Sequence, residues 1–136
     1  MTARYEFDTS EVDQLAASFA AAVEEMRPEL ERVTERGAYN IRRDARRSVR
    51  ERSTGTYLPH YPRSITYEMV ADSDAVEAEI GPEVDKPQGG MGPGVEFGSA
   101  TRTRVTPPIP HLFPALEAEE PRYARQLVRL LEGVLR

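Results

Sequence analysis

The chain has 136 residues, of which 39% are hydrophobic and 30% are charged, and its formal net charge is −5. These numbers indicate one soluble globular domain with a modest core. The sequence contains no cysteine, which excludes disulfides and thiolate metal sites. No apolar run approaches the roughly 18 residues of a membrane span. The N-terminus, "MTARYEFDTSE", lacks the layout of a signal peptide, so we expect a protein used in cytoplasm or in a particle assembled there.

Charge is distributed along the chain in blocks. Residues 1–35 sum to −6, residues 36–52 to +5, residues 66–98 to −7 and residues 99–136 to +2. Such blocks are compatible with ordinary solvated faces. They are also compatible with one basic and one acidic face, an arrangement suited to head-to-tail contact between copies.

Residues 8–52 are predicted to be helical. Asp8, Thr9 or Ser10 can cap the helix, because their side chains accept bonds from free backbone N–H groups. Apolar residues recur every three or four positions, with one wide step that Gly37 or Ala38 fills; they are Val12, Leu15, Phe19, Val23, Met26, Leu30, Val33, Ile41, Ala45 and Val49. The phase continues through Pro28, where we expect a kink or a tight break without a change of face.

The middle of the chain is predicted to form a small antiparallel sheet. Residues 53–63 are rich in glycine and proline and indicate a loop. "SITYEMVAD" and "AVEAEIGP" alternate apolar and polar residues on either side of "DSDA", which predicts a hairpin. Residues 81–94 are expected to be a flexible loop, and residues 95–97 and 102–106 short strands that extend the sheet.

From Pro108 to the end, the spacing predicts helix again. Leu112, Leu116, Tyr123, Leu127, Leu130 and Val134 keep helical phase. Pro121 interrupts the segment, which predicts a short helix followed by a longer one. The order of elements gives an α+β fold: a long kinked N-terminal helix and a C-terminal helix packed on a small antiparallel sheet, in a single domain over residues 1–136.

We find no catalytic or metal-binding pattern in the sequence. His60 and His111 lie in proline-rich segments without a spaced carboxylate cluster, which favours a structural or solvent-facing role over a metal site. "GGMGPG" lacks the Lys-Ser/Thr ending of a phosphate-binding loop and favours an ordinary loop. Glu77 and Glu79 share a strand face and resemble surface carboxylates. We therefore expect neither an enzyme nor a cofactor.

Arginines gather on the outer side of the first helix, at Arg36, Arg42, Arg43, Arg46, Arg47 and Arg50. Such a row can follow a phosphate backbone. However, no aromatic residues are interleaved for base stacking, and the rest of the chain is acidic. The pattern favours a protein-contact or solvated face, while nucleic-acid binding stays an alternative.

Several short motifs occur together in a characteristic order. They are Thr54-Gly55, Ser64-Ile65, Val95-Glu96-Phe97-Gly98-Ser99, and Pro110-His111-Leu112-Phe113-Pro114-Ala115. In this order they resemble the bacteriophage tail-completion or head–tail joining family, which includes minor-tail-protein-Z-like sequences. Two positions differ from the family pattern: His111 stands where the family has Phe, and Phe113 where it has Arg.

The resemblance implies a small α+β structural subunit of the virion tail or neck, assembled in the host cytoplasm. It implies a ring, expected to be a hexamer, that contacts the tail tube protein and the head connector or stopper protein while genome DNA passes through the lumen without specific binding. Whether the ring terminates or joins the tail stays open. A bacterial adaptor or nucleic-acid-binding regulatory domain is the alternative.

We expect acidic residues of the 66–98 block to meet the basic helix surface of a neighbouring copy, together with residues of the last two motifs and the run between them. The expected interface residues are Arg42, Arg43, Arg46, Arg47, Arg50, Glu77, Glu79, Glu83, Asp85, Glu96, Phe97, Gly98, Arg102, Arg104, Leu112 and Phe113.

Overall fold

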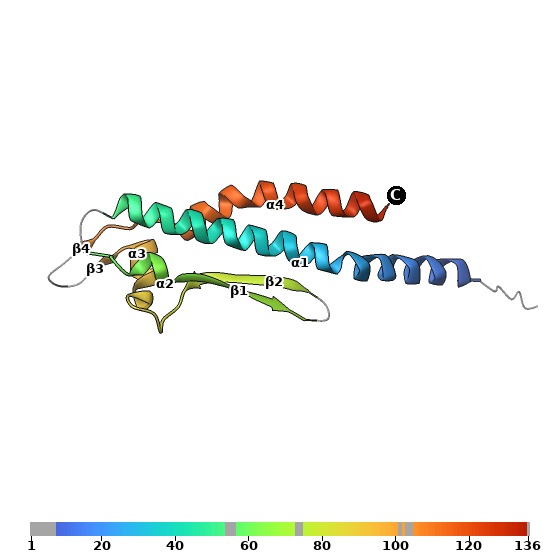
Figure 1. Ribbon diagram of the computed structural model, residues 1–136, viewed down its shortest axis with the longest axis horizontal. Helices are drawn as coiled ribbons and strands as arrows, with labels where there is room; N and C mark the ends of the chain where they lie inside the picture. Colours follow the sequence, from blue (N-terminus) through green and yellow to red (C-terminus); the bar gives the residue numbers. More distant parts are fainter. Residues whose placement is uncertain (1–7, 54–56, 73–74, 101, 103–104, 136) are drawn as a thin grey trace, which may run out of the picture.

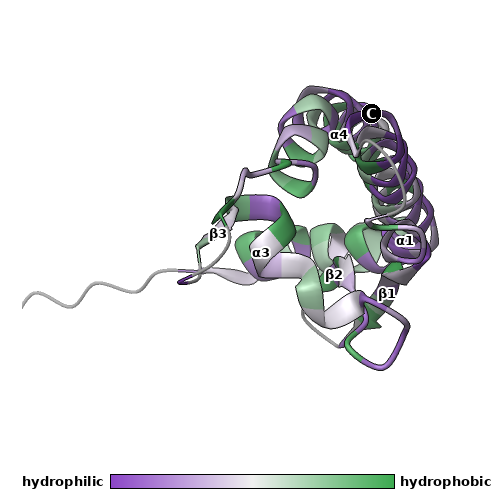
Figure 2. Ribbon diagram, turned by 90° about the vertical axis from the view of Figure 1, so that its left-hand side faces the viewer, coloured by the Kyte–Doolittle hydropathy of each residue, from purple (hydrophilic) through white to green (hydrophobic). Residues whose placement is uncertain are grey.

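The computed structural model describes residues 8–53, 57–72, 75–100, 102 and 105–135. The chain folds around one long helix, α1 (Ser10–Arg52), as Figure 1 shows. The hairpin β1 (Ile65–Ala71) and β2 (Val76–Pro82) packs on α1, and so does the C-terminal helix α4 (Leu112–Val134). Viewed from one end, α4 and the hairpin lie on different sides of α1 (Figure 2). The predicted α+β architecture is confirmed.

α1 runs without a break through Pro28. In Figure 1 its first, blue part is inclined slightly to the rest, as expected for a kink without a change of face. Thr9 is the N-cap residue, and the Asp8 carboxylate accepts a hydrogen bond of 2.9 Å from the Ser10 backbone N–H. The single helix predicted from the continuous apolar phase is therefore confirmed.

The predicted antiparallel hairpin is confirmed, and its register places apolar residues of the two strands opposite each other. Ile65 pairs with Pro82, Tyr67 with Ile80 and Met69 with Ala78. These paired side chains share one face of the sheet because side chains alternate along a strand. Ile65 is fully buried against α1, while Glu77 and Glu79 point away to solvent.

The prediction for residues 81–97 is wrong in most of its detail. A 3₁₀ turn, η1 (Gly89–Met91), leads directly into a helix, α3 (Gly92–Phe97), where a flexible loop and a short strand were expected. Pro93 suits the first turn of that helix, and three alternating residues are too few to specify a strand. The Gln88 side chain accepts hydrogen bonds from the backbone N–H groups of His60 (2.8 Å) and Tyr61 (3.1 Å), which holds the preceding loop in place.

Three further boundaries differ from the prediction. The segment expected to be loop contains a short helix, α2 (Tyr61–Ser64). The strands β3 (Ser99–Ala100) and β4 (Val105–Thr106) pair with each other and do not extend the hairpin in the described residues. α4 begins at Leu112, not Pro108, and continues through Pro121 as one helix.

The core lies at the C-terminal end of α1, where all elements meet. Ile41, Ala45 and Val49 repeat at helical spacing and bury one face of α1. Their buried partners come from the other elements: Leu58, Tyr61, Ile65, Val95 and Ala115. The first half of α1 has no comparable cover, so the apolar stripe that begins at Val12 is buried only in its second half.

Candidate functional site

Glu96, the glutamate of the "VEFGS" motif, caps the N-terminus of α4. Its carboxylate accepts hydrogen bonds from the backbone N–H groups of His111 (2.7 Å), Leu112 (3.1 Å) and Phe113 (3.0 Å). These groups have no partner inside the helix, and the positive end of the helix dipole favours an anion there. Only 4% of Glu96 is exposed, so this residue, expected at an interface, is instead buried inside the chain. The motif Val95–Ser99 and the motif Pro110–Ala115 are thus joined by these three hydrogen bonds.

His111 and Tyr61 complete this buried network. The His111 Nδ1 atom lies 2.7 Å from Glu96 Oε2 and 2.7 Å from the Ile109 carbonyl oxygen, so its N–H faces two acceptors. Nε2 lies 2.8 Å from the Tyr61 hydroxyl, which donates to it when the imidazole is neutral. The two rings meet edge to face, with centroids 5.4 Å apart. We call Tyr61, Glu96 and His111 the buried lock.

Burial and hydrogen bonding shift the pKa values of Glu96 and Tyr61 in opposite directions. Burial opposes the Glu96 charge, but the three backbone N–H groups and the His111 ring together lower the pKa of that carboxyl. Burial, with the nearby Glu96 charge, raises the pKa of Tyr61 to about 12. His111 and Tyr61 have no exposed surface. The lock is therefore suited to fixing α3 and α4 to the core, and it gives His111 the structural role that the sequence favoured.

An exposed aromatic pair lies beside the lock. Phe97 and Phe113 are 67% and 55% exposed, and their ring centroids are 5.9 Å apart. Gly98 follows with a φ of +80°, and a Cβ there would lie 2.9 Å from the Thr106 carbonyl oxygen. Leu112 faces inward and packs against the core. The motif residues thus divide into buried anchors and a surface pair.

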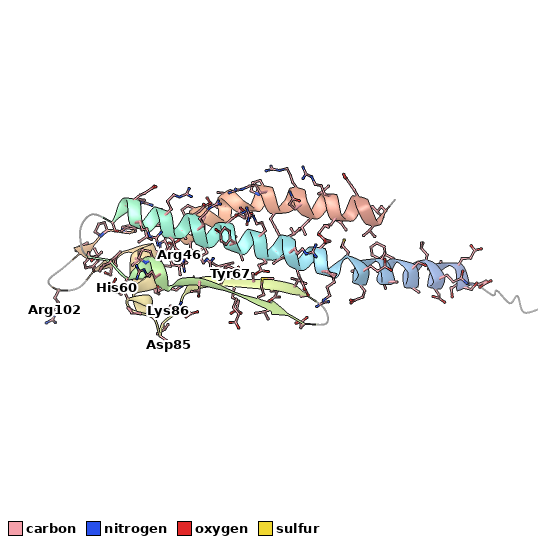
Figure 3. All side chains as sticks on the ribbon, in the orientation of Figure 1. Arg46, His60, Tyr67, Asp85, Lys86 and Arg102 are labelled. Atoms are coloured by element: carbon pink, nitrogen blue, oxygen red, sulfur yellow. The ribbon has the colours of Figure 1, made fainter. Side chains whose placement is uncertain are left out.

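Two arginines of the expected basic surface bind the chain's own hairpin. The Arg42 guanidinium lies 4.7 Å from the centre of the Tyr67 ring. Arg46 Nε donates to the Ile65 carbonyl oxygen at 2.9 Å (Figure 3 labels Arg46 and Tyr67). Burial, and then the neighbouring Arg42 and Arg50, lower the pKa of Arg46. Both side chains fasten α1 to β1.

The other arginines of the expected surface differ in their surroundings. Arg43 Nε is 3.1 Å from the Asp44 carboxylate, and Arg47 and Arg50 are exposed. Arg102 is exposed near the end of the molecule where β3 and β4 lie (Figure 3), and Arg104 lies outside the described residues. Among the described residues, the expected arginines are therefore divided between contacts inside the chain and the exposed surface.

The expected acidic residues are exposed on and after β2. Glu77, Glu79 and Asp85 form no ion pair within the described part of the chain. Glu83 accepts a hydrogen bond of 2.9 Å from the Thr66 hydroxyl and lies 3.8 Å from Lys86 Nζ. Asp85 and Lys86 are at the loop beyond β2 (Figure 3). These carboxylates are accessible to an outside partner.

A second set of polar contacts joins α1 to α4. Asn40 donates to Glu119 at 3.0 Å, and the hydroxyls of Thr34 and Tyr123 are 3.0 Å apart. Arg122 Nε lies 3.2 Å from the other Glu119 oxygen, at ion-pair distance but without hydrogen-bond alignment. Sequence reasoning missed this set. A signal was present, because Glu119 falls in phase with Leu116 and Tyr123 on the face that α4 turns to α1.

In the described ranges, no cluster of three or more candidate ligand side chains is arranged to hold a metal ion. The same residues include no helix with the length and apolarity needed to cross a membrane. No protein-family model, curated protein or solved structure matches the chain.

Proposed function

We propose that this chain is a structural protein of a tailed bacteriophage that forms a ring at the head–tail junction and acts in tail completion. The ring joins the tail tube to the head connector. The observation that carries the proposal is the cap between Glu96 and the backbone N–H groups of residues 111–113. Two of the four motifs that carry the family resemblance, Val95–Ser99 and Pro110–Ala115, are thereby parts of one physical unit, which gives their order and spacing a structural reason.

The exposed surface also supports an assembly role. Phe97 and Phe113 leave aromatic area in water directly beside the rigid lock. Large exposed side chains on a fixed scaffold are typical of protein–protein contacts, where they act as anchors. In this proposal the phenylalanine pair contacts the next copy or the tail tube. Arg47 and Arg50 remain accessible to acidic residues such as Glu79 of a neighbour.

The alternative, a regulatory domain that binds nucleic acid through the arginine helix, receives less support from the geometry. A phosphate-tracking helix needs several guanidinium groups facing outward together. Arg42 lies over Tyr67, and Arg46 is bound to a backbone carbonyl, so two of the expected contacts are already used inside the chain.

Deletion of the gene from the phage or prophage that carries it tests the proposal. We expect filled heads and separate tails, by negative-stain electron microscopy, and recovery of joined particles when the gene is supplied in trans. Normal infectious particles from the deletion strain would contradict the proposal. Steep salt-dependent duplex binding by the purified protein would favour the alternative.

A further inference from the structure

The first half of α1 is an amphipathic helix whose apolar face has no partner in the described chain. Its large apolar side chains repeat at helical spacing, and Val12, Leu15 and Phe19 are 65%, 71% and 50% exposed. In Figure 1 this blue part of α1 extends past the hairpin and past α4. Isolated helices of this length are marginal in water, so burial of the stripe is the expected source of stability. We call residues 10–23 the free half of α1.

The free half of α1 is acidic on both sides of its stripe. Its charged residues are Glu11 and Asp13, and Asp8, Glu24 and Glu25 lie next to it, so five carboxylates and no basic residue occur from Asp8 to Met26. At about 100° per residue, Glu11 flanks the stripe on one side and Asp13 on the other. A surface that covers this stripe is therefore expected to combine an apolar floor with positive charge along both walls.

A groove of this kind lies between α1 and α4. It has a volume of about 490 Å³, and its lining includes Val33 and Tyr123, which are both half-buried. Five arginines line it: Arg32 and Arg36 from α1, and Arg122, Arg125 and Arg129 from α4. The one carboxylate in the lining, Glu119, is already bound to Asn40. Arg125 and Arg129 form no ion pair with any residue that the structure describes. We call this the arginine groove.

We propose that the free half of α1 docks in the arginine groove of a second copy of this chain. The stripe covers Val33 and Tyr123, while Glu11 and Asp13 approach the arginines of the two walls. This is the helix-in-groove mode of recognition, here with complementary charge. The length also fits, since Arg122 to Arg129 spans about two helical turns, or ~10 Å, and the stripe supplies more than two turns.

The contact is heterologous, because the docking helix and the groove are different surfaces of each copy. Such contacts repeat head to tail and close into a ring when the rotation allows it. The inference rests on the proposed ring and names the surfaces that build it. It differs from the contact expected from sequence, which paired the Arg42–Arg50 surface with the acidic 66–98 block.

Three double variants of the full chain test the proposal by mass photometry and analytical ultracentrifugation. The stripe variant is Leu15→Gln with Phe19→Gln, since glutamine is polar and a good helix former. The groove variant is Arg125→Glu with Arg129→Glu. The matched control, Arg63→Glu with Lys86→Glu, makes the same change in net charge at exposed positions away from the groove. All substituted side chains are exposed, and circular dichroism checks that each variant stays folded.

We expect the wild type and the control to assemble alike. The stripe and groove variants should each raise the dissociation constant between copies by roughly thirtyfold or more, the factor for a loss of about 2 kcal/mol. An equimolar mixture of the two variants should form dimers and nothing larger, because the intact helix of one copy fits the intact groove of the other. If copies instead bound each other stripe to stripe, mixing the two variants would not restore a contact between them.

Several results would overturn the proposal. These are a monomeric wild type at all concentrations or a groove variant that assembles as the wild type does. A third is assembly that is lost only in a fourth double variant, Arg47→Glu with Arg50→Glu, on the basic surface expected from sequence. Loss of DNA binding without a change in assembly in the groove variant would also overturn it. The two proposals fail differently: assembly through the groove, with normal particles after gene deletion, leaves the inference standing and removes the phage function.

Discussion

Replacing Glu96 with glutamine removes the charge that caps α4 while keeping the size of the side chain. The carboxylate serves three backbone N–H groups and the His111 ring in a site that is 4% exposed. Glutamine offers one acceptor oxygen and turns an amide N–H₂ toward the remaining donors. Each buried donor left without a partner costs about 1–3 kcal/mol. Relaxation and the remaining bonds reduce the sum, so we expect Glu96→Gln to lower the free energy of unfolding by about 2–4 kcal/mol.

Urea denaturation followed by circular dichroism measures this loss, and thermal denaturation should show it as a fall in Tm of roughly 6–15 °C. Glu79→Gln, at an exposed position on β2, is the matched control and should stay within about 0.5 kcal/mol of the wild type. If Glu96→Gln is as stable as Glu79→Gln, the cap does not hold α4 and the reasoning fails.

The same variant has a pH signature. The pKa of Glu96 is lower in the folded chain than its ordinary value, so the folded state favours the charged form. This contribution to stability is fully present above the unfolded pKa of about 4.3 and is lost as the pH falls through the folded pKa. The stability difference between the wild type and Glu96→Gln should therefore be constant from pH 6 to 7 and shrink below about pH 4. A difference that grows in acid would refute the assignment of the charge.

The remaining predictions concern single contacts, each measured as the free energy of unfolding in urea. Tyr61→Phe leaves the buried imidazole without its hydroxyl partner and should cost about 1–2 kcal/mol; no loss would mean that this bond contributes nothing. Gly98→Ala should cost more than about 1 kcal/mol because of its positive φ and the nearby carbonyl, whereas Gly37→Ala, where a Cβ meets only ordinary contacts, should be neutral or stabilising by up to about 1 kcal/mol. Equal effects at the two glycines would contradict this. Arg46→Met should cost about 1–2 kcal/mol and Arg47→Met almost nothing, since only the first binds a backbone carbonyl; the reverse order would refute it.

The regular elements could be predicted from the sequence because their periodicity is local. The apolar phase of α1 was sufficient to predict the helix, and the alternation of the hairpin residues was sufficient to predict the two strands. Residues 92–97 were not predictable in this way, since the alternation in "VEF" is equally compatible with one turn of helix. The choice between strand and helix depends on the N-terminus of α4, which is distant in sequence and which Glu96 caps.

Burial and charge pairing depend on tertiary contacts that spacing does not contain. Arg42 and Arg47 belong to the same row in the sequence, but one lies over Tyr67 and the other faces solvent. Glu119 stands in an acidic run and is nevertheless buried against Asn40. The helical phase of Glu119 on α4 was the one sequence feature that indicated its burial. The structural role of His111 depends on its backbone position at the start of α4 and on the partners of its two ring nitrogens, and spacing along the sequence contains neither.

The proposal of a ring at the head–tail junction is tested most directly by a reconstruction of the particle from the phage or prophage proposed to encode this chain. We predict a ring of copies between the portal-side connector and the first tail tube ring, with the free half of α1 of each copy in the arginine groove of the next. Particles that contain no density for this chain at the neck would contradict the claim.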